Sequence, residues 1–99
     1  MSIFKYSNPV EAQRKLNAYM RLVGHKQRPL YISNRASKKY YVINQYGKRV
    51  HFGQMGYEDY TKHKDEERRK RYRLRAITIN GKWQGNPFSP NNLSIHVLW

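Results

Sequence analysis

Apolar residues recur at helical spacing near the start of the chain. Five of them fall on one side of a helix with about 3.6 residues per turn: Ala12, Leu16, Tyr19, Met20 and Val23. Asn8-Pro9 followed by Glu11 is typical of a capped helix start, and Gly24 of a C-terminal stop. The pattern predicts that residues 1–24 supply an N-terminal helix, which packs on the rest of the domain by one face.

Residues 39–52 change to the alternation of β-strands. Lys39–Asn44 is rich in β-forming residues, Gln45–Lys48 is turn-like, and Arg49–Phe52 alternates again. We therefore predict a central β-hairpin. The predicted inward-facing residues are Tyr41, Ile43, Val50 and Phe52, with Arg49 and His51 facing outward. A short apolar island, residues 30–32, is a candidate for a further strand within the basic connector 25–39.

A charged helix is predicted within residues 57–76, starting at Thr61 or Asp65. Acids come first and bases later, which suits the helix dipole. Three acid-to-base pairs lie four residues apart, namely Asp65–Arg69, Glu66–Lys70 and Glu67–Arg71. The apolar anchors are few: Tyr72, Leu74 and Ala76. We expect this helix to be weakly attached and mostly solvated.

The remaining residues, 77–99, are predicted to form a C-terminal arm. Ile77–Ile79, Asn80-Gly81 and Lys82-Trp83 have the pattern of a tight hairpin. Ser89-Pro90 is typical of the start of a short helix over the last residues, although residues 93–97 also alternate like a strand. The apolar ending Leu98-Trp99 is expected to dock, either on the chain's own core or on a partner. The fold class is therefore α+β, in one small domain spanning residues 1–99, with residues 39–76 as its central part.

Charge decides the expected partner. The 99 residues include 20 Lys plus Arg against 6 Asp plus Glu, for a formal net charge of +14. Such an excess opposes compaction by self-repulsion and favours a polyanion, whose binding releases counterions. The absence of cysteine excludes disulfides and thiolate zinc sites. With no signal-like or membrane-spanning segment, we expect action in the cytoplasm or nucleus and do not expect membrane binding.

Two basic zones are the candidate contacts for nucleic acid. The first lies on the charged helix: Arg68, Arg69, Lys70, Arg71, Arg73 and Arg75. The second lies on the hairpin: Lys38, Lys39, Lys48 and Arg49. Arginine forks match phosphate oxygens, whereas no motif for sequence-specific readout is present, and DNA is favoured over RNA. The competing interpretation is a solvated charged face. The nearby Tyr40, Tyr41 and Tyr46 are interpreted as core residues rather than as stacking platforms for bases.

Catalysis is not expected, and no cofactor, metal or small-molecule substrate is predicted. His25, His51, His63 and His96 lack metal-ligand spacing. A nuclease could pair His51 or His63 with Asp59 or Asp65. Helix capping explains both acids, however, and no phosphate-binding loop or nucleophile elbow occurs.

Several ordered motifs resemble an uncharacterised short basic domain encoded by large eukaryotic (nucleocytoplasmic) DNA viruses. They are Lys39–Val42, Gly47–Gly53, Gly56–Thr61, His63–Arg68 and Arg71-Tyr72, with a similar close in Ser89–Ser94 and Leu98-Trp99. The resemblance implies no activity and no functional residues. It implies a setting, in which a small structural protein of a virus particle, a minor capsid or genome-associated component, contacts nucleic acid or acidic capsid proteins. The alternative is a non-specific nucleic-acid-binding accessory protein that stays outside the virion, in the infected cell.

Overall fold

The N-terminal helix forms where its capping signals predict. In the computed structural model, which describes residues 2–99, helix α1 spans Pro9–Val23 after the short 3-10 turn η1 (Ile3–Lys5). The side-chain oxygen of Asn8 accepts a hydrogen bond from the Glu11 amide at 3.2 Å, which caps the helix start. Gly24 ends the helix with a left-handed φ of 78°, a conformation that glycine adopts without steric cost.

Three antiparallel strands form one sheet in the order β1 (Tyr31–Ile32), β2 (Lys38–Ile43) and β3 (Arg49–Gln54). The predicted hairpin and the candidate strand before it are both present. The predicted inward face of β2 is wrong. Tyr40 is paired with Phe52, and Val42 with Val50, so Tyr40 and Val42 are the buried apolar residues of β2, and Ile43 is 38% exposed. Residues that are paired across two strands face the same side of the sheet, and side chains alternate along each strand. Because Phe52 faces inward on β3, Tyr40 and Val42 face inward on β2, and Tyr41 and Ile43 face outward.

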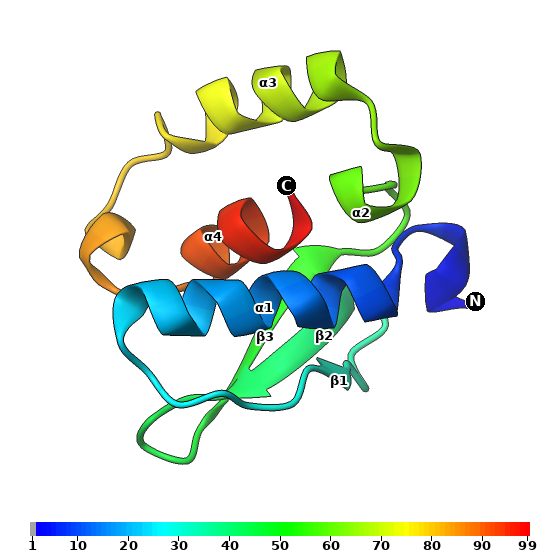
Figure 1. The fold of residues 1–99 in the computed structure, drawn as a ribbon. Helices are drawn as coiled ribbons and strands as arrows, with labels where there is room; N and C mark the ends of the chain where they lie inside the picture. The colour runs from blue at the N-terminus through cyan, green and yellow to red at the C-terminus, as the bar shows by residue number, and fades with distance from the viewer. Residues whose placement is uncertain (1) are drawn as a thin grey trace.

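The core lies between this sheet and two helical segments, giving a compact α+β single domain (Figure 1). One segment is α1, and the other joins α4 (Pro90–Leu93) to the π-helical turn η3 (Ser94–Leu98). The buried apolar residues of the sheet and helices are Ala12, Leu16, Tyr19, Met20, Tyr40, Val42, Phe52, Leu93, Val97 and Leu98. The ends of the chain therefore supply much of the core.

The charged segment consists of two helices, α2 (Tyr60–His63) and α3 (Glu66–Ala76). Helix α3 arches over α4 on the far side from the sheet (Figure 1). Ala76 is its one buried residue, and Tyr72 stacks on Trp99, but the predicted anchor Leu74 is 59% exposed. Leu74 fails as an anchor because Ala76 and Tyr72 already face the body of the domain, and Leu74 lies between them in sequence.

The arm differs from the prediction in its first half. Residues 77–82 form no strand, and the 3-10 turn η2 (Trp83–Gly85) follows. The Trp83 indole donates to the Ile79 carbonyl at 2.8 Å, and the Asn92 amide donates to the carbonyls of Trp83, Gln84 and Asn86. These bonds hold the segment as a loop against α4. The predicted final helix is confirmed, with Ser89 as its cap.

Candidate nucleic-acid interface

Helix α3 presents its arginines in two rows. Asp65 caps the helix by accepting from the amides of Glu67 and Arg68, at 3.0 and 3.3 Å. Residues three or four apart share one side of a helix. One row is therefore Arg68, Arg71 and Arg75, and the other is Arg69 and Arg73. Each row lines a separate groove.

The first groove, which we call the α3–sheet groove, has a volume of about 870 Å³. Arg68, Arg71 and Arg75 line one wall, and Lys38 lies at the start of β2 on the other. The structure thus brings together residues from the two basic zones that the sequence predicts. The remaining polar and aromatic lining includes Gln54, Tyr57, Glu58, Tyr72, Asn91, Ser94 and Trp99.

The floor of the groove depends on a glycine. Gly53 in β3 has a φ of 78°, and a Cβ at this position would lie 2.7 Å from Cδ1 of Leu98. Any larger residue would be strained at this φ and would displace the side chain of Leu98. Gly53 therefore allows the close approach that shapes this groove.

The groove carries surplus positive charge. Arg68 lies 3.9 Å from Glu58, and Arg71 lies 3.8 Å from Glu67, and all four side chains are substantially exposed. Within residues 2–99, Lys38 and Arg75 have no acidic partner at ion-pair distance. Over the same residues, six of the 20 Lys and Arg side chains are paired with acids and the other fourteen are not.

Lys39 was predicted to contact a polyanion, and its position contradicts that prediction. Its side chain is 3% exposed, and its Nζ lies 3.0 Å from Oδ2 of Asp59, whose side chain is 0% exposed. Burial lowers the pKa of Lys39, and the charge of Asp59 opposes this shift. The sequence predicts that Asp59 caps a helix start, and it does cap α2. No sequence pattern indicates its pairing with Lys39, which lies 20 residues earlier.

The hairpin zone is divided between the two ends of the sheet. Lys38 lies at the groove, whereas Lys48 and Arg49 lie at the turn between β2 and β3. A six-residue strand spans about 17 Å at ~3.3 Å per residue. Lys48 and Arg49 are exposed, and the guanidinium of Arg49 lies 4.9 Å from the centre of the Tyr41 ring. They do not line the groove.

The second groove lies on the other side of α3. Arg69, Lys70 and Arg73 line it together with Trp83, Ile95 and His96, and its volume is about 750 Å³. The Nε of Arg69 donates to the backbone oxygen of Trp99 at 2.6 Å, and its guanidinium lies 3.4 Å from Glu66. Arg69 therefore helps attach α3 to the end of η3.

Leu98 and Trp99 were predicted to dock, and they dock on the chain itself. Leu98 is 1% exposed within the core, and the Trp99 ring stacks on Tyr72 with a centroid distance of 4.3 Å. The Trp99 ring also lies 5.1 Å from His63, whose pKa is lowered chiefly by burial. A role for Leu98 in docking a partner is therefore wrong for this fold, because almost all of its side chain is buried in the core.

The three hairpin tyrosines have different surroundings. Tyr40 is a core residue, as expected, and its hydroxyl donates to Oγ of Ser7 at 2.7 Å. Burial raises its pKa well above the usual range. Tyr41 is half-buried on the outer sheet face, where it stacks on Tyr31, and Tyr46 is 78% exposed at the turn. The core interpretation therefore holds for Tyr40 and is wrong for Tyr46.

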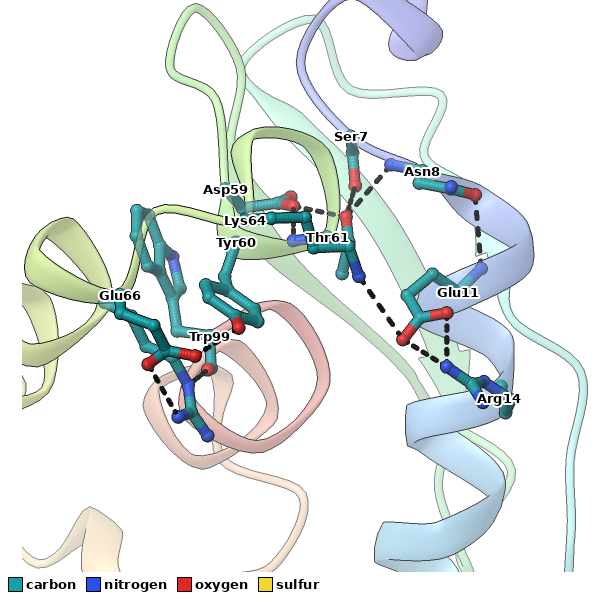
Figure 2. Close-up of polar contacts among 11 residues, drawn as sticks. Ser7, Asn8, Glu11, Arg14, Asp59, Tyr60, Thr61, Lys64, Glu66 and Trp99 are labelled. Atoms are coloured by element: carbon teal, nitrogen blue, oxygen red, sulfur yellow. Dashed lines mark hydrogen bonds and ion pairs between the residues drawn. The ribbon is translucent and has the colours of Figure 1, made fainter.

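A polar network that the sequence analysis missed joins α2 to α1 (Figure 2). The hydroxyl of Thr61 lies 3.1 Å from Oγ of Ser7 and accepts from the Asn8 amide at 2.9 Å. Glu11 lies 2.6 Å from Arg14 and 3.5 Å from Lys64. The Arg14 contact is the main cause that lowers the pKa of Glu11. These contacts anchor the base of the charged segment on the N-terminal helix.

The acids of the nuclease alternative have structural roles. Asp59 caps α2 and pairs with Lys39, and Asp65 caps α3 and donates its amide to Nδ1 of His63 at 2.8 Å. Nδ1 of His51 lies 2.7 Å from Oγ of Ser33. Across residues 2–99, no cluster of three His, Cys, Asp or Glu side chains has the geometry to hold a metal ion. None of the helices in that range is long and apolar enough to span a membrane.

Comparison with known proteins gives one partial match. Residues 29–76 match the model of a family described as "Family of unknown function (DUF5754)". Neither the curated proteins nor the solved structures contain a match to the chain. The matched stretch covers the sheet, α2 and α3, and leaves out α1 and the closing segment from Ser89 to Trp99. This central stretch, with every arginine of α3, is therefore similar to a family whose description gives neither a function nor a viral origin.

Proposed function

We propose that the protein binds nucleic acid without sequence specificity and that the phosphate backbone lies in the α3–sheet groove. Lys38, Arg68, Arg71 and Arg75 supply the contacts. The observation that carries this proposal is their convergence, because cations from a strand and from a helix line one groove. Phosphate contacts of this kind position a nucleic acid but read no bases.

The charge distribution supports this function over a merely solvated surface. Lys38 and Arg75 lack acidic partners within residues 2–99, and the Glu58 and Glu67 pairs of Arg68 and Arg71 are long and exposed. Exposed pairs of this kind contribute little to stability, typically about 0–1 kcal/mol. These four basic side chains are therefore available to bind phosphate groups at little cost to the stability of the fold.

A salt series with duplex DNA tests the electrostatic claim. The logarithm of the affinity is expected to fall linearly with the logarithm of the salt concentration, with a slope of about −0.9 for each phosphate contacted. Four contacts give a slope of about −3 to −4. Affinity that does not change with salt would contradict the proposal.

A double variant locates the interface. Arg71→Gln with Arg75→Gln is expected to reduce the magnitude of the salt slope by about 2, since two phosphate contacts are lost. The matched control is Arg21→Gln with Lys26→Gln, which removes the same charge from exposed positions outside the groove. If both double variants lose the same affinity, net charge rather than the groove governs binding.

The viral setting is a separate proposal and depends on the sequence resemblance. We propose that the binding serves a small structural component of a DNA virus particle, in contact with the genome or with acidic capsid proteins. Mass spectrometry of purified particles from the source virus is expected to detect the protein. Its absence from particles would favour the accessory role in the infected cell.

A further inference from the structure

Beside and within the second groove lies a group of cations that nucleic-acid binding in the first groove does not use. We call it the α1–α3 cluster: Lys15 of α1, Arg69 and Arg73 of α3, and His96 of η3. Arg69, Arg73 and His96 line the groove. The cluster therefore gathers two arginines, a lysine and an imidazole from three separate elements.

Aromatic rings hold these groups in place. Nζ of Lys15 and Cζ of Arg69 lie 5.5 and 5.0 Å from the centre of the Tyr60 ring. His96 stacks on Tyr19, one turn beyond Lys15 on α1, with a centroid distance of 4.6 Å and an interplanar angle of 6°. The site is consequently built from ordered side chains rather than from flexible surface lysines.

Acids neutralise only part of the cluster: Arg69 pairs with Glu66, and Glu67 also lines the groove, but within residues 2–99 Lys15 and Arg73 have no acid at ion-pair distance. Glu66 lies near it, but this carboxylate accepts from the Tyr60 hydroxyl, pairs with Arg69 and is 69% exposed. Nε of Arg73 is buried and has no hydrogen-bond partner in the structure, and its guanidinium reaches the Ile95 carbonyl only at 3.5 Å. A buried donor without an acceptor is costly.

The electrostatic effect of this arrangement is visible in two of its members. Burial lowers the pKa of Lys15 to about 8, and the charges of Arg69 and Arg73 act in the same direction. Burial also lowers the pKa of His96, again with help from Arg73 and Lys15. The arrangement thus disfavours the positive charge of Lys15 and His96, and a bound anion would reverse that effect.

We propose that the α1–α3 cluster binds a phosphate group, either as free phosphate or as a phosphomonoester, with Arg73 and Lys15 as its principal donors. A phosphate oxygen would accept hydrogen bonds from the Arg73 guanidinium, and the phosphate charge would be shared by Lys15 and Arg69. The groove is larger than one phosphate, and its apolar lining of Trp83, Ile95 and Ile77 leaves room for the organic part of an ester. This site lies on the opposite side of α3 from the nucleic-acid groove.

Titration with inorganic phosphate, followed by NMR, tests the proposal. At constant ionic strength set with sodium chloride, phosphate is expected to shift the signals of the His96 ring and the Arg73 Nε–H saturably, with one site per chain. Phosphate binding is also expected to raise the pKa of His96. Signals that move equally with chloride, or that never saturate, would overturn the proposal.

Two matched variants of one helix separate this site from the proposed function. Arg73→Met is expected to weaken phosphate binding about tenfold or more, the usual effect of losing a charged hydrogen bond. Arg75→Met, on the other row, is expected to leave phosphate binding unchanged while weakening binding to duplex DNA. Equal loss of phosphate affinity in both variants would overturn the site, and unchanged DNA binding in Arg75→Met would count against the groove instead.

A nucleoside monophosphate distinguishes the two sources of phosphate. Tighter binding than inorganic phosphate, with shifts at the Trp83 indole, would assign the site to an ester. Equal binding without such shifts would assign it to the free ion. If neither probe binds to the folded wild-type protein, the proposal is wrong. Lys15→Met provides a second check, since it removes a donor from α1 without altering α3.

Discussion

The body of the domain and helix α3 use positive charge in opposite ways. In the body, Lys39 is buried against Asp59, and the pair joins β2 to the cap of α2. In α3, six of the eleven residues are basic, Ala76 alone is buried, and the nearby acids are mostly exposed. A run of cations therefore does not by itself identify a binding surface. The partner of each cation distinguishes a structural charge from one that is available to a ligand.

The largest expected effect comes from removing the acid of the buried pair. Asp59→Ala leaves Lys39 buried without its counter-charge and removes the cap of α2, so it should lower the free energy of unfolding by about 3–5 kcal/mol. Asp65→Ala, the matched change at the cap of α3, should cost about 1 kcal/mol. Urea denaturation of both variants measures the contrast. Similar losses of stability in the two variants would show that the buried Lys39–Asp59 pair contributes no more than a helix cap.

The next comparison separates two neighbours in sequence. Leu98→Ala removes a core side chain and should cost about 2–5 kcal/mol. Trp99→Ala removes the stack on Tyr72, worth about 0.5–1.5 kcal/mol, and should release α3 before the body. Hydrogen exchange should then show faster exchange of the α3 amides with the α1 amides still protected. Uniform loss of protection in Trp99→Ala would mean that α3 and the body unfold together.

A smaller effect is expected in the pH dependence of the free energy of unfolding. Because the folded pKa of Lys15 is about 8, below its ordinary value of 10.5, the unfolded chain binds more protons between these values. Stability should therefore rise as the pH increases from about 8 toward 10. Buried Tyr40, whose pKa is raised, should reverse the trend above its ordinary pKa of 10. Urea midpoints between pH 7 and 10 measure the rise, and Lys15→Met should flatten it, apart from the share due to Lys39.

The smallest effect is expected at the exposed row of α3. Arg71→Gln and Arg75→Gln should each change the free energy of unfolding by no more than about 0.5 kcal/mol. The Arg71–Glu67 pair is exposed at both ends, and Arg75 has no acidic partner within residues 2–99. Thermal melting of the two variants checks this. A substantial loss of stability would mean that these arginines belong to the structure of the domain rather than to a ligand site.

Local signals made much of the fold predictable. The caps at Asn8 and Gly24, the hairpin turn and the acid-to-base order of α3 each act within a few residues, and each has its expected place in the structure. The hairpin expected around Asn80-Gly81 did not form, because hydrogen bonds from Trp83 and Asn92 hold that segment as a loop. No local pattern contains that information.

The site was predictable as a set of residues, but its division between two grooves was not. The spacing of the α3 arginines defines two rows, whereas what each row faces depends on packing. The burial of Lys39 depends on Asp59, and the contribution of Lys15 depends on α1 lying beside α3. Lys15 and His96 have no distinctive sequence context, so long-range contacts alone could reveal them.

The origin of the core limits the autonomy of the family-like stretch. Tyr40, Val42 and Phe52 lie within residues 29–76, yet α1 and η3, which shield them from water, lie outside. Excised from the chain, that stretch would expose one apolar side of a three-stranded sheet and should not fold alone. A polypeptide that carries the same stretch must therefore cover this apolar face with other residues, either from its own flanking sequence or from another molecule. Such proteins can therefore share helix α3 and differ in the segments that cover the sheet.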